Sequence, residues 1–292
     1  MSAAPDKHAP GIESLPRLSH ADFGRFSALI HELAGVQFRP EKLPLLAAKL
    51  GRRLRALGLD SYTLYYDRVR TSAEERQRML EAIVTGETRL FREPGHFEFV
   101  THTLIPRWRD AAAHGLRPRT VRAWSAGCST GEEPHSIAIA LLAGLGSGWT
   151  VQVIASDLSR IALETARAGI WDVDRVKDVP IALRRYVLRG VGSQTGRMKA
   201  TAEVSQVISF LQLNLHDASY PFTTPFDLIF CRNVLIYFGT DAKVGVLRRM
   251  SRHLAADGHL FLGHAESITG LVTGLRCVRP TIHMLSTGGD AE

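Results

Sequence analysis

The residues best placed to do chemistry are two carboxylates that directly follow a turn of small residues. The turn, at 125–131, comes after a short apolar run, and Glu132 and Glu133 follow it. Gly127 and Gly131 permit a tight turn and close approach of the backbone to a ligand. The spacing is not GxGxxG, and two carboxylates here would repel phosphate, which argues against a pyrophosphate-binding dinucleotide site. The pair suits a cationic ligand, and S-adenosylmethionine carries both an ammonium and a sulfonium group.

A further acidic residue lies at the end of the next expected strand. Residues 150–156 (TVQVIAS) are typical of a buried strand that ends at Asp157, and a helical pattern follows. An acid at the end of the second strand of a nucleotide-binding domain can accept hydrogen bonds from both hydroxyls of a ribose. The alternative is that Asp157 only caps the next helix. Because the 125–133 turn lies about 25 residues upstream, we favour ribose binding.

These side chains need an α/β domain to position them. A strand, a turn and a helix beginning at Thr120 form its first unit. The apolar run FDLIFC after Pro225 predicts a buried strand that ends at Arg232 and Asn233. A β insertion is predicted at about 185–206, where MKATAEVSQVISF suggests short antiparallel strands. The later elements expected are a helix at 240–254, a strand HLFLGH and final strands at 276–286.

A small all-helical domain is expected ahead of the α/β domain. Ser19 can cap a helix that stops at Gly35, and Gly58 ends a second helix. The first residues are rich in proline and polar side chains, so we expect a disordered tail. The predicted organisation is a tail at 1–18, a helical domain at 19–85 with helices at 19–35, 41–57, 61–70 and 72–85, a linker at 86–119 that contributes to the active site, and a catalytic domain at 120–288.

Composition sets limits on the class of protein. A chain of 292 residues with 45% hydrophobic and 22% charged residues suits a soluble globular protein. No signal peptide or membrane-spanning run is visible, so we expect a cytoplasmic protein without membrane insertion. Three widely spaced cysteines and the absence of HExxH indicate neither a disulfide framework nor a metal site. The net charge of +7 favours an anionic partner without identifying it.

The second expected helix carries the basic run RRLRALG, with Arg52, Arg53 and Arg55. Leucines share one face of this helix, and the basic residues spread over the remaining arc. Most such faces are simply solvated, and the alternative is a docking surface for an acidic partner. The pattern alone does not choose between them.

Several segments occur together in one order: TGETRLFRE, WSAGCSTGEEPHSIAI, ASDLS, LNL, FDLIFCRNVLIYF and GHLFLGHAES, with RRLRALGL ahead of them. Over about 19–285 the chain resembles the CheR family, the chemotaxis protein-glutamate O-methyltransferases. The resemblance implies a Rossmann-like methyltransferase domain with a small β insertion, preceded by a helical domain. It implies S-adenosyl-L-methionine as cofactor and S-adenosyl-L-homocysteine as product. It also implies that the acceptors are glutamates in the cytoplasmic domains of methyl-accepting chemotaxis receptors, with recruitment to membrane receptor arrays.

The resemblance also implies site residues. Gly86 stands where relatives often have Asn, which leaves a backbone contact in place of a side-chain contact, and Leu90 stands where an aromatic residue is usual. The basic residues Arg52, Arg53 and Arg55 would dock the receptor. The glycine loop resembles the form that holds a receptor's C-terminal peptide, although the hairpin could only shield the sheet edge. The loop glycines are Gly190, Gly192 and Gly196; the implied cofactor-binding residues are Gly86, Thr88, Arg92, Ala126, Gly127, Glu133, Asp157, Asn214, Leu215, Arg232 and Asn233.

The chemistry of a glutamate acceptor needs little help. A carboxyl with a pKa of about 4.3 is already an ionised nucleophile at neutral pH, so no general base is required. Arg92 is the candidate for holding the acceptor carboxylate, and Tyr237 is the second candidate for orienting it, unless it is a buried core tyrosine. The alternatives are a methyltransferase of RNA or of another protein, and an adaptor that only senses S-adenosylmethionine. The basic face lacks interleaved aromatics and no NPPY-type motif is present, which disfavours RNA.

Overall fold

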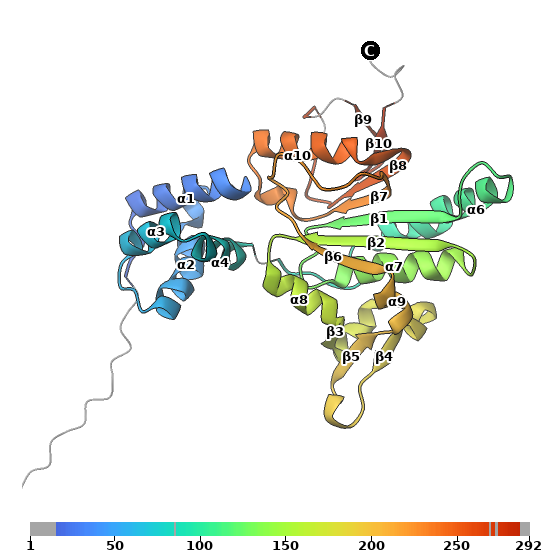
Figure 1. The fold of residues 1–292 in the computed structure, drawn as a ribbon, viewed down its shortest axis with the longest axis horizontal. Coiled ribbons are helices and arrows are strands. Elements are labelled where there is room, and N and C mark those ends of the chain that lie inside the picture. Colours follow the sequence, from blue (N-terminus) through green and yellow to red (C-terminus); the bar gives the residue numbers. More distant parts are fainter. Residues whose placement is uncertain (1–15, 85, 269, 272–273, 287–292) are drawn as a thin grey trace, which may run out of the picture. The chain divides into compact units, whose positions relative to one another are not determined.

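The computed structural model describes residues 16–84, 86–268, 270–271 and 274–286 (Figure 1). Within these residues the chain divides into two compact units. The first contains the residues up to 29 together with 38–83, and the second contains 30–37 and the residues from 84 onward. The tail expected at 1–18 lies, except for its last three residues, outside the described residues.

The helical unit confirms the helices expected from the sequence. Ser19 accepts the Asp22 N–H on its Oγ at 3.0 Å and so caps the first helix. Phe26 and Tyr65 are fully buried and stack with ring centroids 5.7 Å apart. Gly58 adopts a left-handed conformation, which ends the basic helix. The helices are α1 (His20–Ala34), whose last third belongs to the other unit, the 3-10 turn η1 (Pro40–Lys42), α2 (Leu43–Leu57), α3 (Tyr62–Thr71) and α4 (Ala73–Ile83).

The second unit is built on a twisted, mostly parallel sheet. Among the described residues seven strands pair in the order β6-β2-β1-β7-β8-β10-β9, and β10 runs antiparallel to both of its neighbours. The expected Rossmann-like fold is therefore confirmed. The strands are β1 (Thr120–Ala126), β2 (Thr150–Asp157), β6 (Ile208–Gln212), β7 (Phe226–Cys231), β8 (Leu254–Leu262), β9 (Leu275–Arg279) and β10 (Ile282–Leu285).

Helices cover both faces of this sheet (Figure 1). Alternate residues of β1 point to opposite faces: Val121 joins the core beneath α7, and Trp124 joins the core beneath α10. Both side chains are fully buried. The helices of this unit are α5 (Pro94–Phe99), a π-helical turn η2 (Val100–Leu104), α6 (Ile105–Ala113), α7 (Glu132–Leu145), α8 (Arg160–Ala168), the 3-10 turn η6 (Leu235–Tyr237) and α10 (Thr240–Arg252).

The insertion is a small antiparallel sheet, which differs in part from the expected one. Within the described residues it has the order β3-β5-β4, and it uses residues 170–172 outside the predicted range. Residues 202–206 were expected to be strand and are helical, because they need bury only Val204, which packs into the main core. The elements are β3 (Ile170–Asp172), η3 (Val173–Asp178), η4 (Ile181–Tyr186), β4 (Val187–Arg189), η5 (Gly192–Gln194), β5 (Arg197–Ala200) and α9 (Ala202–Gln206).

Candidate active site

The turn after β1 packs directly against two other elements. Gly127 and Gly131 have φ of +79° and +95°. A Cβ on Gly127 would lie 2.6 Å from Cγ2 of Val234, and a Cβ on Gly131 would lie 2.8 Å from Cα of Ala166. Both glycines are therefore required by the protein's own packing. Close approach of a ligand to the same backbone remains a prediction.

Asp157 connects this turn to the start of α8. Its Oδ2 accepts the Ser129 N–H at 2.8 Å, and its Oδ1 accepts the Ser159 N–H at 2.9 Å. The N-cap residue of α8 is Ser159, whose Oγ accepts the Ala162 N–H at 3.2 Å. The capping role that the sequence offered for Asp157 is thus filled by Ser159. The carboxylate is half-buried, at the carboxyl end of a strand that pairs with β1, where a ribose would lie.

A buried ion pair lies on the other side of the turn. Arg232 donates through Nε to Oε2 of Glu133 at 2.7 Å, and Oε1 of Glu133 accepts the hydroxyl of Ser125 at 2.7 Å. The Arg232 side chain is only 2% exposed. Its Nη1 donates to the backbone carbonyl of Arg92 and lies 3.3 Å from Nδ1 of His96. Arg232 therefore joins β7, α7 and the segment at 86–93, and we propose that it positions cofactor-binding residues instead of touching the cofactor itself.

The segment at 86–92 is held by backbone contacts from three directions. Besides the contact from Arg232, Arg175 donates to the Thr88 carbonyl at 2.5 Å, and the Phe91 N–H donates to Oγ of Ser136 at 2.9 Å. Phe91 adopts φ of +49°. A left-handed conformation costs a non-glycine residue about 1–2 kcal/mol. These contacts hold it there, so the segment has a defined shape before any ligand binds.

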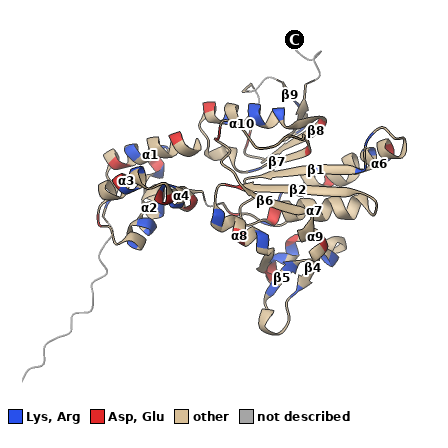
Figure 2. Cartoon of the chain, viewed as in Figure 1, with Lys and Arg blue, Asp and Glu red and all other residues tan. Residues whose placement is uncertain are grey.

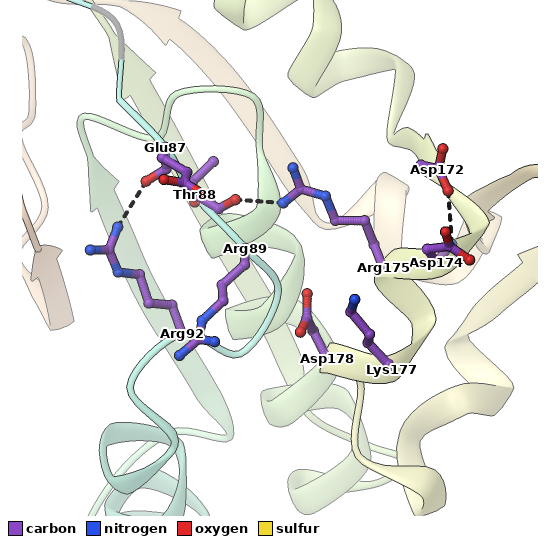
Figure 3. A pocket seen from close by; sticks show the side chains of 9 residues that line it. All are labelled: Glu87, Thr88, Arg89, Arg92, Asp172, Asp174, Arg175, Lys177 and Asp178. Atoms are coloured by element: carbon purple, nitrogen blue, oxygen red, sulfur yellow. Dashed lines mark hydrogen bonds between the residues drawn. The ribbon is translucent and has the colours of Figure 1, made fainter.

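An open pocket borders this segment (Figure 3). Its volume is about 550 Å³. Arg92 lines the pocket and donates through Nη1 to the Glu87 carbonyl at 2.8 Å. Among the described residues no carboxylate lies within ion-pair distance of Arg92, so its guanidinium can receive one. Arg89 also lines the pocket, and Arg175 reaches across it towards Thr88 (Figure 3). The full lining is Glu87, Thr88, Arg89, Arg92, Asp172, Asp174, Arg175, Lys177 and Asp178.

The remaining predicted residues occupy distinct places. Asn214 donates through Nδ2 to the Leu33 carbonyl at 2.7 Å, and Leu215 beside it is buried. Tyr237 is 47% exposed, so the alternative of a buried core tyrosine is wrong. Its hydroxyl has no partner within the described parts of the chain. Gly86 is exposed, has no positive φ and has open space where a Cβ would lie, so the fold itself does not require glycine there.

The basic residues of α2 differ from one another. Arg53 makes a bidentate ion pair with Glu75, at 2.9 and 2.8 Å, and Tyr65 donates to the same carboxylate at 3.0 Å. Arg52 and Arg55 are exposed. Figure 2 shows Lys and Arg interspersed with Asp and Glu over the helices of this unit. The charge of Arg53 is used inside the helical unit, which leaves Arg52 and Arg55 to carry the docking hypothesis.

Two buried residues near the site were missed by the sequence reasoning. His96 is buried, its Nε2 lies 2.7 Å from Oγ1 of Thr281, and burial together with the charge of Arg232 lowers its pKa to about 3. Glu266 is 2% exposed and binds backbone N–H groups of two loops. The only available signal for Glu266 was its presence in the quoted segment GHLFLGHAES. No periodicity distinguishes such a carboxylate from a surface one.

The described residues contain neither a metal-ligand cluster nor a helix that could span a membrane. No cluster of three or more His, Cys, Asp or Glu side chains that could hold a metal ion occurs in them. None of their helices is both long enough and apolar enough to cross a bilayer.

Comparison with known proteins gives the class. Residues 21–84 match the family model "CheR methyltransferase, all-alpha domain", and residues 86–283 match "CheR methyltransferase, SAM binding domain". The chain belongs to the CheR methyltransferase family, and its cofactor is S-adenosylmethionine.

Curated relatives agree with this assignment over most of the chain. The chain is 38% identical to a chemotaxis protein methyltransferase of Salmonella typhimurium, with 92% of this chain and 91% of the relative covered. It is 36% identical to chemotaxis protein methyltransferase 2 of Pseudomonas aeruginosa, with 90% and 92% covered. It is 37% identical to the Escherichia coli chemotaxis protein methyltransferase, with 92% of each covered.

Proposed function

We propose that the protein transfers the methyl group of S-adenosylmethionine to glutamate side chains in the cytoplasmic domains of methyl-accepting chemotaxis receptors. The products are glutamyl methyl esters and S-adenosylhomocysteine. The observation that carries this proposal is the position of Arg92. Its guanidinium has no carboxylate partner in the described chain, and it lines an open pocket together with Thr88, which the sequence resemblance implies as a cofactor-binding residue. An acceptor carboxylate entering that pocket would meet a directional cation.

The residues of the second unit fit the cofactor. Asp157 has both carboxylate oxygens bonded to backbone N–H groups, and an ionised carboxylate is purely an acceptor, as ribose hydroxyls require. Glu133 is held by Ser125 and Arg232 and presents a carboxylate to the ammonium group. When bound, S-adenosylmethionine supplies an electrophilic methyl group on a sulfonium sulfur. The other proposed contacts come from the backbone of Gly86, Ala126 and Gly127, the Thr88 side chain, the Asn214–Leu215 pair and Asn233.

The site offers alignment of reactants and no general base. Burial and the charge of Arg232 lower the pKa of His96 to about 3, so its imidazole is too weak a base to accept a proton at neutral pH. None is needed, because the acceptor glutamate is already ionised. Arg92 would orient the acceptor carboxylate, and the exposed hydroxyl of Tyr237 is a second candidate for the same work. Holding reactants in line contributes chiefly through entropy.

The helical unit would dock the receptor through Arg52 and Arg55. Both are exposed on α2, whose opposite face buries Leu46, Leu50 and Leu54 in the core of that unit. A receptor surface rich in glutamates has the complementary charge, and such contacts mainly raise the rate of encounter. In this proposal the helical unit binds the receptor and the second unit binds the cofactor.

The small antiparallel sheet would hold a C-terminal receptor peptide. Strand β4 is an outer strand, so one of its edges is available for an added strand. Leu188 within it and Val191 just after it are apolar and 55% and 81% exposed. Gly190 is required in the hairpin, because a Cβ there would lie 2.0 Å from the Gln194 carbonyl oxygen. Tethering would recruit the enzyme to receptor arrays and give it a roughly millimolar local concentration of acceptors.

A methyl-transfer assay tests the proposal against its alternatives. Labelled S-adenosylmethionine and the purified protein are incubated in separate reactions with receptor membranes, with receptor-free membranes and with total RNA. We expect alkali-labile label only on receptor membranes. Label on RNA would favour the RNA methyltransferase, and cofactor binding without transfer to any acceptor would favour the adaptor.

A further inference from the structure

A buried carboxylate outside the predicted site connects two of the loops at the carboxyl edge of the main sheet. Oε2 of Glu266 accepts the N–H groups of Gly263 at 2.6 Å and Asn233 at 2.8 Å. Its Oε1 accepts those of Val234 at 2.8 Å and Ile236 at 3.3 Å. Every one of these described partners is a backbone donor, so the arrangement suits an ionised carboxylate, which is purely an acceptor.

The carboxylate joins the loop after β7 to the loop after β8, which are neighbouring parallel strands. Gly263 is needed for this approach: a Cβ there would lie 2.7 Å from Nδ2 of Asn233 and 2.9 Å from Oε2 of Glu266. Asn233 itself adopts φ of +60°. A left-handed asparagine persists when its surroundings fix it, and the bond from its N–H to Glu266 does so.

The loop held in this way carries three of the residues assigned to the site. Arg232 comes directly before Asn233, and its side chain fixes Glu133 and the Arg92 carbonyl. Tyr237 follows in the 3-10 turn η6, whose Ile236 N–H is bound by Glu266. A shift of the Asn233 backbone would therefore move residues on both sides of the site.

Burying an ionised carboxylate costs free energy of folding unless hydrogen bonds compensate for the lost water. Burial raises the pKa of Glu266, and the backbone hydrogen bonds oppose that rise. A purely structural role in closing the sheet edge is the alternative. The two roles differ in their consequences for the folded enzyme, because only a positioning role changes ligand binding when global stability is preserved.

We propose that Glu266 is a positioning residue of the methyltransferase site. It fixes the backbone at Asn233 and thereby sets the Arg232 side chain and the start of the turn that presents Tyr237. The inference rests on the proposed function of the site. It adds a requirement for a carboxylate that would touch neither cofactor nor acceptor.

The first test is hydrogen exchange on the full-length protein carrying Glu266→Gln. The amide substitution removes acceptor positions and places an N–H group against N–H donors. We expect exchange of the amides of Gly263, Asn233, Val234 and Ile236 to accelerate by about tenfold or more in at least one of the two oxygen-bound pairs, since the amide oxygen can replace only one carboxylate oxygen and the NH2 group faces the other pair of donors. Exchange in the β1 and β7 strand cores should remain unchanged. The matched control is Glu98→Gln, an exposed carboxylate on α5. Unchanged protection in the two loops would show that Glu266 does not hold their backbones together.

The second test measures ligand binding and turnover in the same variants. In Glu266→Gln we expect the Kd for S-adenosylhomocysteine to rise and kcat to fall, each by about tenfold or more, as displaced binding groups require. Loops that lose protection while Kd and kcat stay at wild-type values would overturn the positioning role. If Glu266→Gln does not fold, Glu266→Asp replaces it: this variant keeps the charge and shortens the reach, and the same two outcomes decide.

These results are separable from failure of the proposed function. That failure would appear in the wild-type protein, as absence of methyl transfer to receptor membranes, before any variant is compared. The exchange measurement needs no ligand and the Kd measurement uses S-adenosylhomocysteine alone, so neither depends on the identity of the acceptor.

Discussion

Arg232 and Glu133 form a buried ion pair, with Nε and Oε2 2.7 Å apart, across 99 residues of sequence. The same guanidinium binds the carbonyl of Arg92. The pair therefore connects the proposed cofactor acid to the segment that carries the proposed acceptor-binding arginine. Its loss should affect both stability and turnover.

Replacing Arg232 by Met should destabilise the fold by about 3–5 kcal/mol, because it leaves the Glu133 carboxylate buried without its partner. The double variant Arg232→Met, Glu133→Gln should recover part of that loss and none of the activity. Denaturant unfolding of the two single variants and the double variant gives the coupling energy. Additive losses would show that the two side chains act independently.

Asp157→Ala should weaken cofactor binding. Two hydrogen bonds from ribose hydroxyls to a charged acceptor contribute about 1.5–3 kcal/mol each, so the Kd for S-adenosylhomocysteine by calorimetry should rise at least tenfold. Part of the rise would come from the freed Ser129 N–H, which Asp157→Asn can still bind through its carbonyl oxygen. The exposed Asp60→Ala serves as control. An unchanged Kd in Asp157→Ala would remove the ribose assignment.

Arg92→Ala should collapse turnover while leaving the unfolding free energy close to wild type, since the described side chain makes only one hydrogen bond, to a backbone carbonyl. Arg89 lines the same pocket and provides the matched control. We expect Arg89→Ala to change kcat by no more than a few-fold. Near-normal kcat for Arg92→Ala at saturating receptor would exclude Arg92 from the catalytic residues.

Charge reversal on α2 should separate docking from folding. The double variant Arg52→Glu, Arg55→Glu should raise the KM for receptor with an unchanged cofactor Kd, and rising salt should weaken the wild-type interaction. Arg53→Glu should instead unfold the helical unit more easily, because it opposes buried Glu75. If the double variant and wild type had the same receptor KM at low salt, α2 would be a solvated face.

Gly190→Val should abolish binding of receptor C-terminal peptides, because its side chain would collide with the Gln194 carbonyl in the hairpin. Methylation of receptors lacking that tail should be unaffected. Titration of tail peptides against Gly190→Val, wild type and the control Gly24→Ala measures the effect, because an added Cβ at Gly24 would meet only open space. Equal affinity for all three proteins, or no binding of any native tail, would mean that the small antiparallel sheet does not bind receptor tails and only shields the edge of the main sheet.

The local elements could be predicted from the sequence because their signals are local. The apolar run FDLIFC became β7, and the small-residue turn before Glu132 became the β1–α7 connection. Contacts between distant residues could not be predicted. The sequence places Arg53 on a basic face, but in the structure its guanidinium pairs with Glu75, 22 residues away. Residues 202–206 show a further limit, because one buried valine satisfies a short helix as well as a strand.

The most direct measurement identifies the methylated atom. Receptor cytoplasmic domains are incubated with wild-type enzyme and S-adenosylmethionine, digested, and analysed by mass spectrometry before and after mild alkali. The account predicts methyl esters on glutamate side chains that alkali removes, and none with Arg92→Ala at equal enzyme concentration. Methyl groups on nitrogen or on any residue other than glutamate, or equal labelling by Arg92→Ala, would contradict it.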